Sequence, residues 1–283
     1  MMLELNEKKT LFNFLPGSKA FSISTVGCNF RCLHCQNYEI SQYPHFHNGE
    51  IAGTECTAES IVDDAVRGGC SSVCYTYVEP TIFYEFAYDC SVFAHKQQLK
   101  NVFVSNGYMT EEVTRYLAPV LDGINIDIKG FTDNFYKKVC KARLQPVLDS
   151  IRLMHELGVW VETTTLIIPG LNDSDSELRD IARFIKSVDP AIPWHVTAFY
   201  PTYKMMDREP TPVATLRKAR EIGLPEGLHH VYEGNIPGEG GENTYCPACG
   251  EELVRRIGYN IRQNKLTDGR CNKCGKQLAG VWS

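Results

Sequence analysis

The sequence has no apolar run of membrane-spanning length, and its first ten residues, from Met1 to Thr10, are acidic and mixed rather than apolar. A spanning helix needs about 20 mostly apolar residues, and a secretory signal needs an apolar core behind a basic end. We therefore expect a cytoplasmic protein with no membrane partner. Thiols stay reduced in that compartment, so the 12 cysteines indicate metal binding rather than a disulfide framework.

A large excess of either charge is also missing. The net charge is −5, with 22% charged and 43% hydrophobic residues, which excludes a disordered or fibrous chain and does not favour nucleic acid as a partner. Only the part from Cys246 onward is basic, with seven Lys or Arg against three Asp or Glu. The 283 residues suit one large α/β domain with a small basic appendage.

Short β-branched runs alternate with helical patterns, which is typical of a parallel sheet covered by helices. Six such units are fewer than the eight of a closed barrel, and polar residues that follow the strands are the candidates for chemistry. The expected strands are 20–26, 72–78, 101–105, 123–128, 159–168 and 194–199, with a short last strand at 229–232. Helices are expected between them, among them 57–69, 81–97, 173–188 with Asn172 or Asp173 as its cap, and 212–223.

Three cysteines follow the first expected strand in C-x3-C-x2-C spacing: Cys28, Cys32 and Cys35. Thiolates select zinc, copper(I) or iron–sulfur clusters. A zinc site or a four-iron cluster ordinarily takes four protein ligands, so three of them leave one coordination site open. Two alternatives remain, namely three packed core cysteines and zinc with a distant fourth ligand. We interpret the ungrouped cysteines as packed apolar side chains; these are Cys56, Cys70, Cys74, Cys90 and Cys140.

Two C-x2-C-Gly pairs stand near the C-terminus, with 21 residues between them. Cys246, Cys249, Cys271 and Cys274 are predicted to form a tetrahedral zinc or rubredoxin-type iron site. A module of fewer than about 40 residues needs such a metal for its stability. The glycine-rich stretch 237–244 is predicted to be a flexible linker between a domain at 1–236 and the knuckle module at 245–283.

The C-x3-C-x2-C loop resembles the cluster loop of the radical S-adenosylmethionine (SAM) superfamily. The resemblance implies a partial (βα)6 barrel, a [4Fe-4S] cluster on the three cysteines with His34 beside it, SAM on the open iron and an external electron donor. The segments Tyr75–Pro80 and Ile168–Asp173 and the double knuckle ending Ala279–Trp282 are most similar to the radical SAM protein of the AmmeMemoRadiSam system. That protein is a relative of the pyruvate formate-lyase (glycyl radical enzyme) activating enzymes.

The resemblance also assigns SAM contacts at the strand ends. Glu79 is similar to the last residue of the superfamily's Gly-Gly-Glu motif, with Tyr77 and Val78 in place of the glycines, and would bind the SAM ammonium. Ser105, Asn106, Asp127 and Lys129 match activase segments near the SAM carboxylate, although Val104 replaces an aspartate that binds a cation there. Thr165 and Ile167 are expected at the ribose and the adenine. The alternatives are a solvated Glu79 and an Asp127–Lys129 pair with a purely structural role.

The leading hypothesis is a radical SAM enzyme that cleaves SAM reductively to a 5′-deoxyadenosyl radical and abstracts hydrogen from a protein or peptide, in the manner of glycyl radical activases. One alternative is radical modification of a small molecule or a nucleic-acid base. Another is a metal-dependent scaffold without catalysis.

Overall fold

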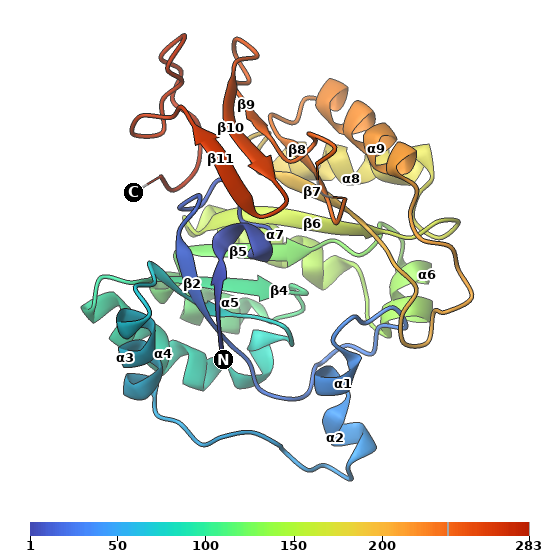
Figure 1. Ribbon diagram of the computed structural model, residues 1–283. Helices are drawn as coiled ribbons and strands as arrows, with labels where there is room; N and C mark the ends of the chain where they lie inside the picture. Colours follow the sequence, from blue (N-terminus) through green and yellow to red (C-terminus); the bar gives the residue numbers. More distant parts are fainter. Residues whose placement is uncertain (237, 283) are drawn as a thin grey trace.

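The computed structural model describes residues 1–236 and 238–282. Its main element is a curved eight-stranded sheet in the order β1 to β8, in which β2 to β8 are parallel and β1 is antiparallel to β2 (Figure 1). The strands are β1 (Met2–Leu5), β2 (Lys19–Ile23), β3 (Ser72–Tyr75), β4 (Lys100–Ser105), β5 (Gly123–Asp127), β6 (Trp160–Ile167), β7 (Trp194–Ala198) and β8 (Val231–Gly234). The expected α/β architecture is confirmed, and β1 is an addition that the sequence pattern missed.

Helices cover the outer face of the sheet (Figure 1). They are α3 (Ala58–Arg67), α4 (Tyr84–Lys96), α5 (Glu111–Leu117), α6 (Asp133–Phe135), α7 (Gln145–Glu156), α8 (Asp175–Val188) and α9 (Val213–Glu226). Of these, α3, α4, α7 and α9 contact the strands next to them in sequence. Two short helices, α1 (Tyr38–Ser41) and α2 (Tyr43–Phe46), follow the cysteine loop, and a π-helical turn spans Tyr136–Cys140. No helix in the described part of the chain has both the length and the apolar character that a bilayer crossing demands.

The helix starts follow from local side-chain chemistry. Thr57 and Ser60 form a reciprocal capping box at the start of α3. Helix α8 is capped by Ser174, whose hydroxyl accepts from the N–H of Glu177, so the expectation of Asn172 or Asp173 is wrong. The Asn172 side chain has another use, because it donates to the Lys129 carbonyl at 2.8 Å and so ties the loop after β6 to the end of β5.

The N-terminal segment 6–18 runs through the interior of the barrel. Leu11 and Phe14 are fully buried there against inner-face residues of β2, β3 and β4. The N–H groups of Phe12 and Asn13 donate to the buried carboxylate of Glu162 at 3.0 and 2.8 Å. Segment 6–18 therefore fills the barrel below the C-terminal ends of the strands.

The carboxylate of Glu162 is also the hydrogen-bond partner of His195 on β7. The two side chains are buried, and His195 Nε2 lies 2.6 Å from Glu162 Oε2. A histidine with such a partner satisfies its polar atoms inside the core. His195 thus belongs to the network that holds segment 6–18 in place.

The C-terminal module forms an antiparallel sheet of β9 (Thr244–Tyr245), β10 (Glu252–Ile257) and β11 (Asn260–Asn264), and it packs on the barrel (Figure 1). Its anchor is Arg256, whose side chain has no exposed surface. The guanidinium donates to Thr244 Oγ1 at 2.8 Å and to the Phe12 carbonyl at 2.9 Å. Val281 pairs with Phe14 in a second contact with segment 6–18.

The stretch 237–244 differs from the expected flexible linker. Glu242, Asn243 and Thr244 are buried, and the Gly241 carbonyl accepts from the N–H of Glu233 at 3.0 Å. Residue 237 lies outside the described residues. The burial of 242–244 corrects the prediction of flexibility for this part, because the packing of the module on the barrel immobilises it.

Candidate active site and metal centre

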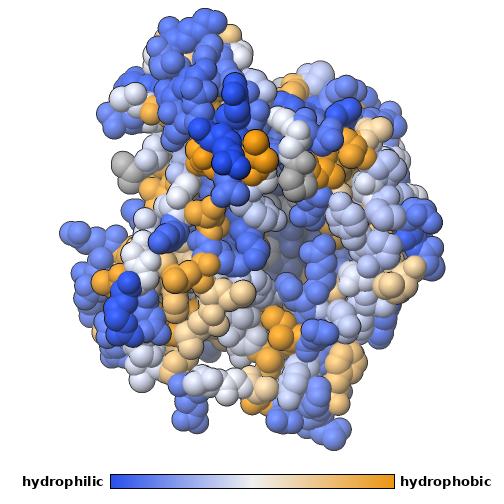
Figure 2. Space-filling model, in the orientation of Figure 1, coloured by the Kyte–Doolittle hydropathy of each residue, from blue (hydrophilic) through white to orange (hydrophobic). Residues whose placement is uncertain are grey.

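A pocket of about 390 Å³ opens at the C-terminal ends of the parallel strands. Its walls come from the cysteine loop, the ends of β3 to β8, segment 8–10 and the hairpin between β10 and β11. In Figure 2 this face of the molecule is hollowed below the C-terminal sheet. The location agrees with the rule that barrel chemistry collects where parallel strands end.

Cys28, Cys32 and Cys35 all line this pocket. Among the described residues, only the four tail cysteines bring their thiols close enough together for a single ion. The three thiols of the cysteine loop do not form such a group in the described part of the chain. A structural zinc ion takes four protein ligands, whereas three thiolates leave one iron of a four-iron cluster open.

The cysteine loop is held in place by the π-helical turn Tyr136–Cys140. The N–H of Arg31 donates to the Cys140 carbonyl at 3.1 Å, and the N–H of Leu33 donates to the Val139 carbonyl at 3.0 Å. These two bonds flank Cys32. Single π turns are frequent at functional sites, and this one fixes the loop that would carry the cluster.

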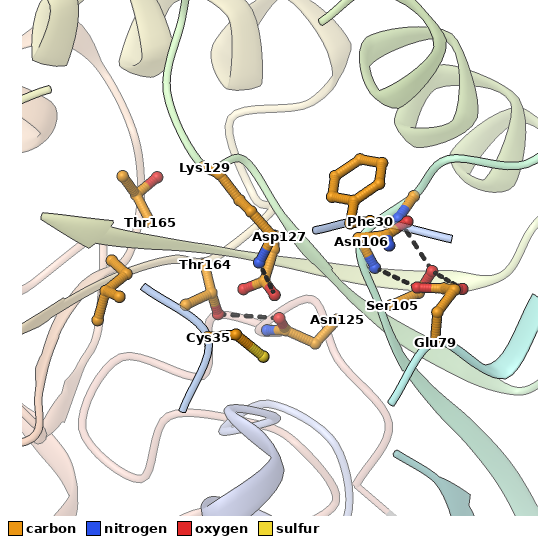
Figure 3. A network of polar contacts seen from close by, with 12 residues as sticks. Phe30, Cys35, Glu79, Ser105, Asn106, Asn125, Asp127, Lys129, Thr164 and Thr165 are labelled. Carbon is orange, nitrogen blue, oxygen red and sulfur yellow. Dashed lines mark hydrogen bonds and ion pairs between the residues drawn. The ribbon is translucent and has the colours of Figure 1, made fainter. Parts of the chain in front are cut away.

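Glu79 lies beside the cysteine loop, and both oxygens of its carboxylate accept hydrogen bonds (Figure 3). It accepts from Ser105 Oγ at 2.8 Å, from the Asn106 N–H at 2.7 Å and from both the N–H and the hydroxyl of Thr81. Burial raises the Glu79 pKa, and these hydrogen bonds oppose that rise. Asn106 also places its amide nitrogen 3.9 Å from Cys28 Sγ, so the expected contacts Glu79, Ser105 and Asn106 meet the cysteine loop at one place.

Asp127 and Lys129 form an ion pair inside the pocket, with Lys129 Nζ 2.8 Å from Asp127 Oδ2 (Figure 3). Burial alone would lower the Lys129 pKa, but the neighbouring carboxylate of Asp127 raises it well above its ordinary value. Lys129 is therefore a cation near pH 7. Val104 also lines the pocket, so this wall is apolar where activases carry an aspartate.

His34 is buried and lines the same pocket. Its Nδ1 has no hydrogen-bond partner among the residues that the structure describes. Burial and the charge of Lys129 lower the His34 pKa to about 3, so the ring is neutral near pH 7. A neutral imidazole with a free nitrogen can donate to, or accept from, a group bound in the pocket.

The structure corrects the expectation for Thr165 and Ile167. Neither lines the pocket. The Thr165 hydroxyl accepts from the indole N–H of Trp194 at 2.9 Å, and Ile167 is fully buried in the main core beneath the helices. Successive side chains of a strand point to opposite faces, and on β6 it is Thr164 and Leu166 that face the pocket.

Several pocket residues were not predicted from the sequence, because they belong to no recognisable motif. They come from the N-terminal segment, from the ends of β7 and β8, and from the tail, and they are Lys8, Lys9, Thr10, Thr197, Asn235 and Tyr259. Only their long-range packing brings them to the pocket. No local pattern around Tyr259 could have indicated its position.

The four tail cysteines converge on one point, with all four sulfur atoms within 4.8 Å of one another. The Sγ atoms of Cys246 and Cys274 lie 3.6 Å apart, and those of Cys249 and Cys271 lie 3.7 Å apart. A tetrahedron with metal–sulfur bonds of about 2.3 Å has sulfur–sulfur edges of about 3.8 Å. The thiols therefore fit a single tetrahedral metal ion.

The fold and the cysteine loop together define a class of protein. Residues 22–185 match the family model of the radical SAM superfamily, and the chain belongs to that superfamily. Membership implies a [4Fe-4S] cluster and SAM as cofactors, and the loop cysteines and strand-end residues fit both.

Among curated proteins, the chain is 48% identical over 275 residues to the uncharacterized protein MJ0808 of Methanocaldococcus jannaschii, covering 96% of this chain and 81% of that protein. It is 27% identical over 173 residues to the pyruvate formate-lyase-activating enzyme of Clostridium pasteurianum, covering 57% and 67% of the two chains. The protein is thus related to glycyl radical activating enzymes.

Solved structures share the fold. Streptococcus suis SuiB bound to S-adenosylmethionine aligns with a TM-score of 0.59 at 15% identity, covering 81% of this chain and 53% of SuiB. SuiB bound to its precursor peptide SuiA gives the same TM-score at 14% identity, covering 81% and 51%.

Proposed function

We propose that the protein is an activase-like radical SAM enzyme that abstracts hydrogen from a protein or peptide. The observation that carries this proposal is the convergence of the three loop cysteines with Glu79, Asn106 and the Asp127–Lys129 pair in one pocket. Cys28, Cys32 and Cys35 would hold the cluster, which, once reduced by an external one-electron donor, would supply the electron that splits a C–S bond of SAM into methionine and the 5′-deoxyadenosyl radical.

The residues of the chain would bind and orient SAM. Glu79, held by three neighbouring residues, would receive the SAM ammonium by a charge-assisted hydrogen bond. Lys129 would face the SAM carboxylate, with Asp127 fixing the position of its ammonium. The neutral ring of His34 would close the pocket beside the cluster and help to exclude water.

Two relationships support a peptide substrate. The activating-enzyme relative from Clostridium pasteurianum is named for its action on an enzyme, and SuiB shares the fold and has been solved with a precursor peptide. We further propose that the chain is the radical SAM protein of an AmmeMemoRadiSam system, on the motifs of the strand ends and the tail, and that the tail site binds zinc. The tail thiols match a metal–sulfur tetrahedron that zinc or a single iron would fit, and zinc is favoured because zinc sites dominate such pairs of C-x2-C knuckles.

The test is anaerobic purification with iron, sulfide and zinc analysis, followed by a SAM-cleavage assay with dithionite. Replacing Cys28, Cys32 and Cys35 together by Ala should remove about four irons per chain and abolish 5′-deoxyadenosine formation while the tail metal stays. Cys56→Ala, at an exposed position outside the pocket, is the control and should keep both. A triple variant that retains four irons would place the cluster elsewhere, and a wild-type protein that loads iron but never cleaves SAM would favour a scaffold.

A further inference from the structure

The floor of the pocket is made by the N-terminal segment, at Lys8, Lys9 and Thr10. The Thr10 carbonyl accepts from Asn125 Nδ2 at 2.7 Å, and its hydroxyl accepts from Thr164 Oγ1 at 3.1 Å. Asn125 and Thr164 precede the pocket residues Asp127 and Leu166 by two positions on β5 and β6. Side chains two apart share a face, so Thr10 lies one layer deeper than Asp127 and Leu166.

This floor carries a net positive charge. The ammonium groups of Lys8 and Lys9 both contact the single carboxylate of Glu4, which also accepts from the Tyr77 hydroxyl. Burial alone would raise the Glu4 pKa, but the hydrogen bonds from Lys8, Lys9 and Tyr77 outweigh it and lower the pKa to about 2. Near pH 7 the group therefore holds two cations and one anion.

The two lysines differ in what they can still bind. Lys9 is buried, with its side chain 2% exposed, whereas the Lys8 side chain is 44% exposed. An ammonium has three donors, so Lys8 can receive a second acceptor from the pocket. Of the carboxylates that line the pocket, Asp127 pairs with Lys129 and Glu79 is held by Ser105 and Asn106, so the ion-pair partner of Lys8 is Glu4.

The wall next to this floor belongs to the tail. Tyr259 stands at the tip of the β10–β11 hairpin and lines the pocket. Its position is set by neighbours, since the Gly258 N–H donates to Glu242 Oε1 at 2.9 Å and the buried Arg256 anchors β10 to the barrel. Tyr259 and Lys8 thus line the same pocket, and an aromatic ring and an ammonium in one pocket suit a substrate with an apolar body and an acidic end.

We propose that this floor is a substrate carboxylate site, in which Lys8 binds an acidic group of the substrate and Tyr259 packs against the adjoining part. The inference rests on the proposed function and narrows its substrate class to acidic peptides, with the carboxylate of an Asp or Glu close to the residue that reacts. Lys8 is a binding residue in this scheme and takes no part in bond cleavage.

The test measures binding without turnover, on the anaerobic protein with its cluster oxidised and SAM at saturation. The probes are acetyl-Gly-Asp-amide and the neutral acetyl-Gly-Asn-amide, compared by ligand-observed NMR. The aspartyl peptide should bind about fivefold or more tightly than the asparaginyl peptide. Lys8→Gln should remove this difference, and Lys8→Arg should keep it.

The matched control is Lys218→Gln. It removes a lysine that is similarly exposed, at 49%, and paired with Asp175, and it should leave the preference for the aspartyl peptide unchanged.

Equal binding of the two peptides, or a preference that survives in Lys8→Gln, would overturn the proposal. A separate titration starts without SAM, with the aspartyl peptide bound. Displacement of the peptide as SAM is added would also overturn the proposal, because Lys8 would then bind the carboxylate of SAM. Succinate tests whether the site binds a small free acid instead. If succinate binds in a way that depends on Lys8 while the two peptides bind equally, the peptide substrate is contradicted and the site is assigned to a free acid. Because no step needs SAM cleavage, a failure of the proposed function appears separately, in the cleavage assay.

Discussion

Two opposing effects act on the pKa of Glu79: burial raises it, and the hydrogen bonds from the neighbouring donors lower it. Both effects influence the charge that Glu79 would present to SAM. Glu79→Gln keeps the size of the side chain but removes the charge, and it turns an amide group toward the N–H of Asn106. We expect SAM affinity to fall about tenfold or more, since a hydrogen bond to a charged group is worth about 1.5–3 kcal/mol. Calorimetry on the anaerobic protein with its cluster measures this, with unchanged iron content as the control. Unaltered SAM affinity would leave Glu79 with only the local role of joining β3 to Ser105 and Asn106.

Single residues also show where sequence reasoning reaches its limit. The pocket positions of Glu79, Ser105, Asn106 and Asp127 could be predicted. Each residue lies at or near the end of an expected strand, where the strand ends line the pocket. Thr165 and Ile167 could not be placed correctly, because β6 has threonines at 163, 164 and 165 and the residue types do not reveal which face is the inner one. A shift of one residue moves every side chain of a strand to the opposite face.

At the scale of elements, segment 6–18 and strand β10 depend on each other through Arg256. Its guanidinium spans Thr244 and the Phe12 carbonyl, and its Nε lies 3.7 Å from the buried Glu7 carboxylate. Arg256→Met should lower the free energy of unfolding by about 3–5 kcal/mol, the usual cost of removing one partner of a buried pair. Urea unfolding under anaerobic conditions measures this loss, with the exposed Arg262→Met as the control.

The double variant Arg256→Met with Glu7→Gln should recover part of that stability, because it also removes the charge left without its partner. A loss for Arg256→Met no larger than for Arg262→Met would mean that the tail contributes nothing to the barrel. The strands β2 to β8 could be predicted from their β-branched runs, whereas this contact could not, since Arg256 lies in an ordinary strand pattern and its partner Phe12 is 244 residues away in sequence.

For the whole molecule, the composition of 237–244 suggested two independent parts, and the packing shows otherwise. Glycine-rich sequence predicts flexibility only where nothing packs against it. Here Arg256, Val281 and Tyr259 of the tail contact segment 6–18 or line the pocket. The tail metal would then support the pocket indirectly, because the sheet β9–β11 has only a small core of its own around Cys246, Leu253 and Cys271.

Removal of the tail metal should therefore be felt inside the barrel. We expect the double variant Cys246→Ser with Cys271→Ser to lose this metal, to unfold β9 to β11 and to speed amide exchange in residues 7–15, where Phe12 and Leu15 accept from or donate to the tail. Hydrogen–deuterium exchange with mass spectrometry on the anaerobic protein resolves both regions. Cys90→Ser, at a buried cysteine outside both sites, is the control and should leave the exchange of residues 7–15 slow. If exchange rises only beyond residue 243 in the metal-free variant, the tail is an independent module, and the support it gives to the floor at Lys8 and to the wall at Tyr259 is absent.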